Sequence, residues 1–156
     1  MREKPIRARD VEAQAGQTIY PAPLARIVAG RTKRKLGDVF GLRNFGVNLT
    51  SLEPGAASAL FHCHKVQDEF VYVLEGRPTV VLGDEEYQLD PGDCIGFKAG
   101  TGKGHQLVNR TDAVVTYLEL GDRTPGEQVT YDRDDIAAAL GPGGKWIVTR
   151  KDGTPY

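Results

Sequence analysis

The stretch GAASALFHCHKVQDEFVYVLEG, residues 55–76, carries two histidines and a glutamate among residues typical of β-strands. His62 and His64 lie two residues apart on a predicted strand, so both side chains point to one face, with Cα atoms about 6.5 Å apart. Two imidazoles at this spacing can bind one ion through bonds of about 2.0–2.1 Å. Glu69 can join them only if residues 65–68 turn and Glu69 begins the returning strand. The stretch therefore predicts two strands whose junction gathers three potential metal ligands.

Short predicted strands continue on both sides of this stretch, with Gly- and Pro-containing turns between them. The predicted strands cover residues 45–52, 59–64, 69–74, 79–82, 86–89, 94–97, 105–109, 113–120 and 146–149. Strands at intervals of 8–12 residues are typical of an all-β sandwich or barrel. The 19 glycines and 9 prolines of the chain suit many tight turns. Only Asp134–Leu140 predicts a helix, which Asp132 or Asp134 could cap and Gly141-Pro142 would end.

The third and last histidine of the chain, His105, follows a Gly-rich loop over residues 98–104 and opens another predicted strand. Asn109 shares its strand face and is expected to form structural hydrogen bonds, with a role beside the metal site as the alternative. A lone His-x-His is a weak signal. However, chance would have to place every histidine of the chain in the metal-binding pattern, so we expect a metal site.

Two segments resemble the motifs of the cupin family. Residues 55–76, with His62, His64 and Glu69, resemble the first motif, and residues 92–109, with His105, resemble the second. Strand patterning extends the similarity to about residues 45–120. The resemblance implies an all-β double-stranded β-helix (cupin) barrel.

In metal-binding cupins the matching residues hold one divalent ion, which here implies His62, His64, Glu69 and His105 as its ligands. The chain departs from the motifs in the spacing before His62, in Lys98 where a proline is usual, and in a longer loop before His105. These departures concern the mouth of the cavity and leave the ligand set complete.

The identity of the ion stays open among iron, manganese, nickel, cobalt and zinc. Four protein ligands nearly close a tetrahedral zinc site, whereas an octahedral ion keeps two positions for substrate or water. Imidazole suits several of these metals, so the ligand types alone do not choose among them.

Two classes of function follow from the resemblance. The first is a metal-dependent enzyme acting on a small polar or acidic molecule, either as a sugar or sugar-phosphate isomerase or as a dioxygenase. The second is a non-catalytic module that binds or senses a small molecule and holds a structural metal. The sequence identifies no catalytic residue, because the histidines are assigned to the metal.

The 156 residues suit one domain, with an N-terminal arm over 1–44, a barrel core over about 45–120 and a C-terminal extension over 121–156. The basic residues at 31–35 are expected on a solvated surface. Cys63 and Cys94 are expected as reduced thiols. A homodimer is expected because an exposed barrel edge can pair with a second strand.

Composition argues against several partners. A net charge of −1 disfavours nucleic acid and anionic membranes as partners. No run of 18 apolar residues predicts a transmembrane helix. The first 16 residues lack the apolar segment of a secretory signal, so a cytoplasmic location is expected. The resemblance to cupins implies a small-molecule ligand.

Overall fold

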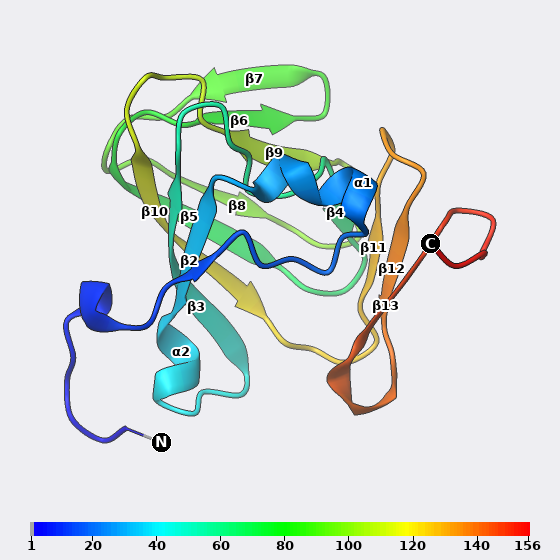
Figure 1. Ribbon diagram of the computed structural model, residues 1–156, viewed down its shortest axis with the longest axis horizontal. Helices are drawn as coiled ribbons and strands as arrows, with labels where there is room; N and C mark the ends of the chain where they lie inside the picture. The colour runs from blue at the N-terminus through cyan, green and yellow to red at the C-terminus, as the bar shows by residue number, and fades with distance from the viewer. Residues whose placement is uncertain (1) are drawn as a thin grey trace.

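The computed structural model describes residues 2–156, and its strands form two layers around a shared core (Figure 1). This confirms the all-β barrel expected from the sequence. The strands and short helices have the following bounds: η1 Ala8–Asp10, β1 Gln14–Ala15, α1 Ala22–Ala25, η2 Arg26–Val28, β2 Arg31–Lys35, α2 Leu36–Val39, β3 Phe45–Leu52, β4 Cys63–His64, β5 Glu69–Glu75, β6 Thr79–Leu82, β7 Glu85–Gln88, β8 Cys94–Phe97, β9 His105–Val108, β10 Val115–Asp122, β11 Gln128–Thr130, β12 Ala137–Leu140, η3 Pro142–Gly144 and β13 Trp146–Thr149.

One layer is a six-stranded sheet with the order β1-β2-β3-β10-β5-β8. The other layer contains a four-stranded sheet, β13-β12-β11-β4, and a three-stranded sheet, β7-β6-β9. An isolated bridge between His62 and His105 joins these two smaller sheets at their β4 and β9 edges. His62 and His105 therefore lie at the junction between the two smaller sheets of the second layer.

The main core fills the space between the layers. The six-stranded sheet contributes Leu52, Val71 and Val115, while Val80 and Leu107 come from the three-stranded sheet, and all five are buried. Burial of this apolar surface holds the layers together at roughly 25 cal/mol for each Å² removed from water. A second cluster, which includes Ile136, packs α1 and η2 against the C-terminal strands.

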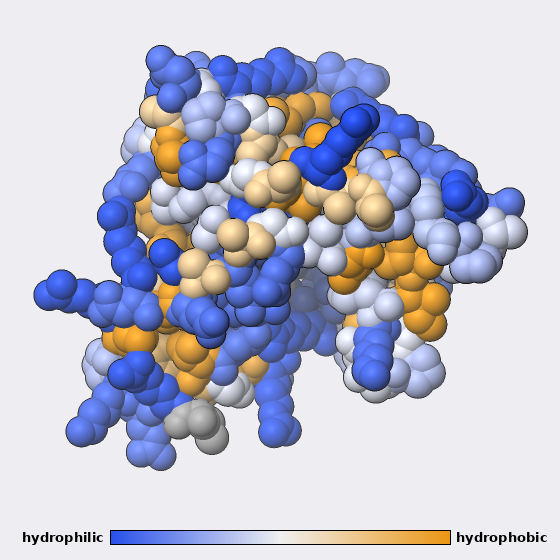
Figure 2. Space-filling view, viewed as in Figure 1, coloured by the Kyte–Doolittle hydropathy of each residue, from blue (hydrophilic) through white to orange (hydrophobic). Residues whose placement is uncertain are grey.

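Much of the surface that Figure 2 shows is hydrophilic, and hydrophobic residues appear there in separate groups. In Figure 1 the N-terminal segment, in blue, crosses in front of the barrel, while β12 and β13 lie at its side. No helix within residues 2–156 is both long and apolar enough to cross a membrane.

The helix predicted over Asp134–Leu140 is wrong. Ala137–Leu140 instead forms β12, which pairs with β11 on one side and with β13 on the other. Alanine favours a helix by less than about 1 kcal/mol per residue, and pairing on both strand edges outweighs that preference here. The neighbouring prediction of a strand over 146–149 is confirmed by β13.

The solvated surface expected for residues 31–35 is wrong for Arg31, which is buried, whereas Lys35 is exposed. These residues form β2, which pairs with β3 over its whole length. The six-stranded sheet therefore begins well before residue 45. Cys63 is buried, Cys94 is exposed, and both are free thiols.

Candidate metal centre

The three histidines approach one another because a backbone bridge joins His62, just before β4, to His105 at the start of β9. The amide of His62 donates to the carbonyl of His105 over 3.1 Å, and the amide of His105 donates back to the carbonyl of His62 over 2.7 Å. Directly paired residues present their side chains on the same face, and His64 follows on that face two residues later. The two ring centroids of His62 and His105 lie 4.5 Å apart.

Glu69 reaches the histidines from the opposite layer. As the sequence predicts, residues 65–68 turn the chain and Glu69 begins β5. The Asp122 carboxylate accepts a hydrogen bond from the Asp68 amide over 2.9 Å at the end of this turn. The turn thus carries the chain from the second layer to the first and brings a carboxylate to face the imidazoles.

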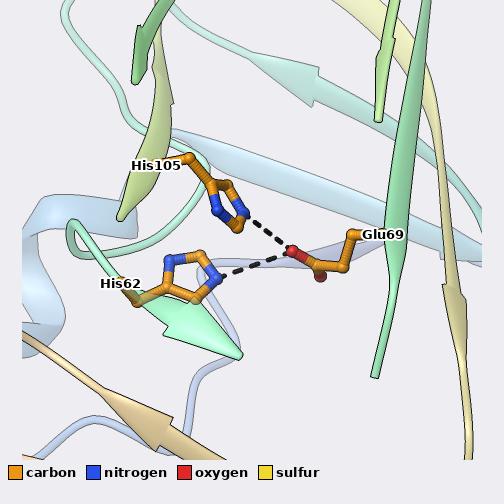
Figure 3. Close-up of side chains that lie close together, drawn as sticks. All are labelled: His62, Glu69 and His105. Atoms are coloured by element: carbon orange, nitrogen blue, oxygen red, sulfur yellow. Dashed lines mark hydrogen bonds and ion pairs between the residues drawn. The ribbon is translucent and has the colours of Figure 1, made fainter. Parts of the chain in front are cut away.

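One carboxylate oxygen of Glu69 lies close to all three histidines. Glu69 Oε2 is 2.8 Å from His105 Nε2, 3.3 Å from His64 Nε2 and 3.7 Å from His62 Nε2. Figure 3 shows His62 and His105 pointing toward this oxygen from one side. Possible ligand atoms of His62, Glu69 and His105 all lie within 4.8 Å of one another. The structure therefore gathers three of the four expected residues tightly, and places His64 beside Glu69.

Two of the rings are held by neighbouring groups. His62 Nδ1 lies 2.7 Å from the carbonyl oxygen of Leu60, which requires a proton on Nδ1 and leaves Nε2 with its lone pair. The ring of Phe97 stacks on that of His105 with centroids 3.7 Å apart and planes within 6°. Gly104 precedes His105, and a Cβ there would lie 2.3 Å from the ring of Phe61, so glycine is needed for this approach.

Glu127 is a residue of the site that the sequence gave no reason to select. It is completely buried, and its carboxylate accepts hydrogen bonds from the amides of Lys65 and Gln128 over 2.9 and 2.8 Å, and from that of Gln67. Its Oε2 also lies 3.5 Å from His64 Nδ1, which forms no hydrogen bond within residues 2–156. Glu127 therefore fixes the turn that carries Glu69 and places a negative charge beside His64. Its place in the loop after β10 is visible only in three dimensions.

The direction of each pKa shift shows which neighbours act on Glu69, His105 and His64. Burial alone would raise the pKa of Glu69, but the hydrogen bond with His105 and the close imidazoles of His62 and His64 hold it well below its usual range. Burial lowers the pKa of His105, and the nearby histidines add to this effect while Glu69 opposes it. Burial also acts to lower the pKa of His64, yet Glu69 and Glu127 outweigh it and raise that pKa. A carboxylate that stays ionised beside His105, whose imidazole is biased toward its neutral form, is the donor set that a divalent cation prefers.

The cluster lies in a cavity of about 210 Å³ between the two layers. The opposite wall, formed by β2 and β10, contributes polar groups: Arg31, Lys33, Tyr117 and Glu119 line the same cavity. Glu119 Oε1 accepts hydrogen bonds from Lys33 Nζ over 2.5 Å and from Asn48 Nδ2 over 2.9 Å. Two carboxylates, Glu69 and Glu119, therefore face one small space.

Asn109 has the structural role expected for it. It is fully buried, and its amide nitrogen donates to the carbonyls of Leu52 and Ala113 over 2.9 and 2.7 Å. Its Oδ1 accepts from the amide and hydroxyl of Thr111. These bonds tie the end of β9 to the strands beside it and do not involve the histidines.

The residues present fit a divalent metal ion. His62, Glu69 and His105 could hold one, since their ligand atoms converge, both imidazoles are buried and the Nε2 of His62 carries a free lone pair. His64 could add a fourth nitrogen from its position 3.3 Å from Glu69. The partner groups behind the rings, Leu60 and Glu127, are the kind that orient metal-bound histidines in proteins.

Comparisons with known proteins agree with this geometry. A family model for the cupin domain matches residues 48–121. The crystal structure of a sugar phosphate isomerase from a cupin superfamily of Silicibacter pomeroyi is 44% identical, with a TM-score of 0.91 over 98% of this chain and 96% of that one. A provisional sugar phosphate isomerase of Acidithiobacillus ferrooxidans is 30% identical, with a TM-score of 0.72 over 81% of each chain. Quercetin 2,3-dioxygenase of Bacillus subtilis is 29% identical over 57% of this chain, which spans only 25% of the length of that enzyme.

Proposed function

The chain belongs to the cupin superfamily, and we propose that it is a metal-dependent isomerase of a small sugar or sugar phosphate. The observation that carries this proposal is a second carboxylate, Glu119, in the same cavity as the His62, Glu69 and His105 cluster. Isomerisation needs a base, and Glu69 could act as one only by leaving the metal. Similarity to a sugar phosphate isomerase over nearly the whole chain supports the same choice of reaction.

The two walls of the cavity would have different roles, one in binding the metal and the other in supplying the base. His62, His64, Glu69 and His105 would hold the divalent ion, whose charge would stabilise negative charge that develops on substrate oxygens. Iron, manganese, nickel and cobalt suit this role better than zinc, because an octahedral ion with four protein ligands keeps two open positions.

Glu119 is the base that we assign to the reaction. Its Oε1 is engaged by Lys33 and Asn48, while Oε2 forms no hydrogen bond or ion pair within the described chain. In aldose–ketose isomerisation, this oxygen would take the proton from the carbon next to the carbonyl and return it to the former carbonyl carbon. The hydroxyl proton moves between the two substrate oxygens at the same time, so no other reactant is consumed. Positioned general bases of this kind contribute about 100- to 10,000-fold to rates.

The test is proton exchange in deuterated water. The metal-loaded protein is incubated with small aldoses, ketoses and their phosphates, and NMR follows deuterium incorporation next to the carbonyl together with product formation. Glu119→Gln should retain the metal and lower the rate by about 100-fold or more. Glu86→Gln, which removes an exposed carboxylate paired with Arg110, should not change it. Equal rates for Glu119→Gln and the unaltered protein would refute the role of Glu119, and no exchange with any substrate would refute the isomerase.

A dioxygenase is the second candidate, favoured by the similarity of 90 residues to quercetin 2,3-dioxygenase. The discriminating measurement is the metal present after purification without added metal, combined with oxygen consumption. Bound iron with substrate-dependent oxygen uptake would select the dioxygenase. Tight zinc with neither uptake nor exchange would select the non-catalytic binding module. The expected homodimer and cytoplasmic location stay predictions.

A further inference from the structure

Arg31 is a buried cation without an anionic partner. Its side chain lies at the start of β2, and only 8% of the residue is exposed. The guanidinium donates to the carbonyl oxygens of Ser58 and of Gln17, the latter over 2.6 Å, and forms no ion pair within residues 2–156. Burying a charge is costly unless an opposite charge compensates it. A guanidinium has five N–H donors, so several remain for a further acceptor.

Tyr117 is a buried donor on the same wall that also lacks a partner. It is completely buried, and its hydroxyl has no hydrogen-bond partner among the residues that the structure describes. Strand pairing places Arg31 beside Leu52 and Val115, and Lys33 beside Thr50 and Tyr117, in adjacent rows of the sheet. Burial raises the pKa of Tyr117 well above its usual value, so the hydroxyl keeps its proton and can donate it.

The charges of the cavity favour an anion. Its walls carry two cations, Arg31 and Lys33, and two carboxylates, Glu69 and Glu119. Lys33 is neutralised by Glu119 at 2.5 Å, and Glu69 is directed to the histidines. A divalent ion at the histidines would leave the cavity positive, with Arg31 as its uncompensated side chain.

We propose that Arg31 and Tyr117 form a subsite for the phosphate or carboxylate group of the substrate, on the cavity wall opposite the histidines. The inference rests on the proposed function for its premise that the substrate enters this cavity. A cavity of about 210 Å³ has room for a small polar compound. The substrate would thus be a small sugar phosphate or sugar acid, with its anionic group on β2 and β10 and its carbonyl end toward the histidines.

The test measures anion binding without turnover, so it stays readable whether or not the protein is an isomerase. Inorganic phosphate and, separately, acetate are titrated into the full chain by calorimetry, with metal bound and after chelation. Arg31→Gln should weaken binding of the preferred anion by about 10- to 100-fold, and Tyr117→Phe by about tenfold. Arg31→Lys should recover part of the loss because it restores the charge. The anion bound more tightly identifies the substrate as a phosphate or a carboxylate.

Arg34→Gln is the matched control. Arg34 lies on the same strand at a position of opposite parity, and its guanidinium likewise donates to a backbone carbonyl, that of Val11, over 2.7 Å. This variant should bind phosphate and acetate as the unaltered protein does.

Circular dichroism and thermal melting establish that each variant is folded. If Arg31→Gln does not fold, Tyr117→Phe and Arg31→Lys carry the test, since both keep most of the packing. Unchanged anion binding in the folded variants, or binding that depends on the metal but not on Arg31, would overturn the proposal. An absence of binding of both anions to the unaltered protein would also overturn it.

Discussion

The two walls of the cavity differ in how completely their polar groups are satisfied. On the histidine wall, His62 is held by a carbonyl and His105 by the ring of Phe97, and His64 Nδ1, which forms no hydrogen bond within residues 2–156, still lies 3.5 Å from the Glu127 carboxylate. On the sheet wall, Arg31 has only neutral partners and the Tyr117 hydroxyl has none within residues 2–156. Buried polar groups in folded proteins are nearly always paired. The comparison indicates a wall already arranged for one ion, and a second wall that is completed when a ligand binds.

The largest effect should follow from removing a ligand on the histidine wall. His105→Ala deletes the imidazole nearest Glu69 and should abolish stoichiometric metal binding. Metal that binds only the folded state stabilises it by about 4 kcal/mol at 1,000 times the dissociation constant, so the variant should also lose this increment. Metal analysis and melting with and without chelator measure both quantities.

Cys63→Ala is the control for this variant, because Cys63 lies between His62 and His64 but faces Thr130 on the other side of the strand. It should keep the metal. A full metal content in folded His105→Ala would contradict the assignment of the site, and the same measurement on His64→Ala decides whether the fourth residue is a ligand.

A smaller effect on the same wall should follow from Glu127→Gln. The amide keeps the shape of the side chain but removes the negative charge beside His64. Its NH₂ group would also face backbone N–H groups that donate hydrogen bonds to the carboxylate in the unaltered protein, so donor would meet donor. Changes to groups behind metal ligands typically weaken metal binding by about 10- to 100-fold. Competition with a chelator of known affinity measures this loss. Asp122→Asn alters a cap of the same turn without contacting a histidine, so an equal loss in both variants would assign the effect to the turn alone.

The sequence predicted the residues of the histidine wall but not those of the sheet wall. Spacing of two residues along a strand predicts that His62 and His64 lie together, and the polar residues at 65–68 predict the turn that delivers Glu69. The structure has the turn and brings the two histidines together, although only Cys63–His64 of the predicted strand over 59–64 is a strand, and His62 joins His105 through an isolated bridge. Arg31 could not be found in this way, because residues 31–35 alternate no hydrophobic side chains, and only their pairing with β3 shows that they belong to the sheet. The same holds for Glu127, whose loop carries no periodic signal.

The strand β10 was predicted from the sequence, but the sequence did not show which of its faces lines the cavity. Val115, Tyr117 and Glu119 share one face, and Thr116, Leu118 and Leu120 share the other. The second set contains more aliphatic residues, so hydrophobicity alone favours the wrong face as the inner one. Pairing with β5 settles the question, because Tyr117 lies opposite Val73 and Glu119 opposite Val71, both of which are buried.

The smallest effects should come from the unpaired hydroxyls of the six-stranded sheet, Thr50 and Tyr117. Thr50→Val and Tyr117→Phe each remove a buried oxygen without a partner in the described chain. Leaving such a group unpaired costs roughly 1–3 kcal/mol, so at neutral pH each variant should be as stable as the unaltered protein or more stable by up to about that amount. Chemical denaturation measures the free energy of unfolding for all three proteins.

Alkaline pH separates the two variants. The pKa of Tyr117 is raised well above its usual value by burial, whereas the unfolded chain releases this proton near pH 10. Above that pH the folded state holds a proton that the unfolded state has lost, so this group's contribution to stability is full at lower pH and declines as the pH rises. Tyr117→Phe should therefore gain relative to the unaltered protein by up to about 1.4 kcal/mol per pH unit. Thr50→Val, whose lost hydroxyl does not titrate, should show no such gain, and parallel pH profiles for the two variants would mean that the pKa of Tyr117 is not raised in the folded protein.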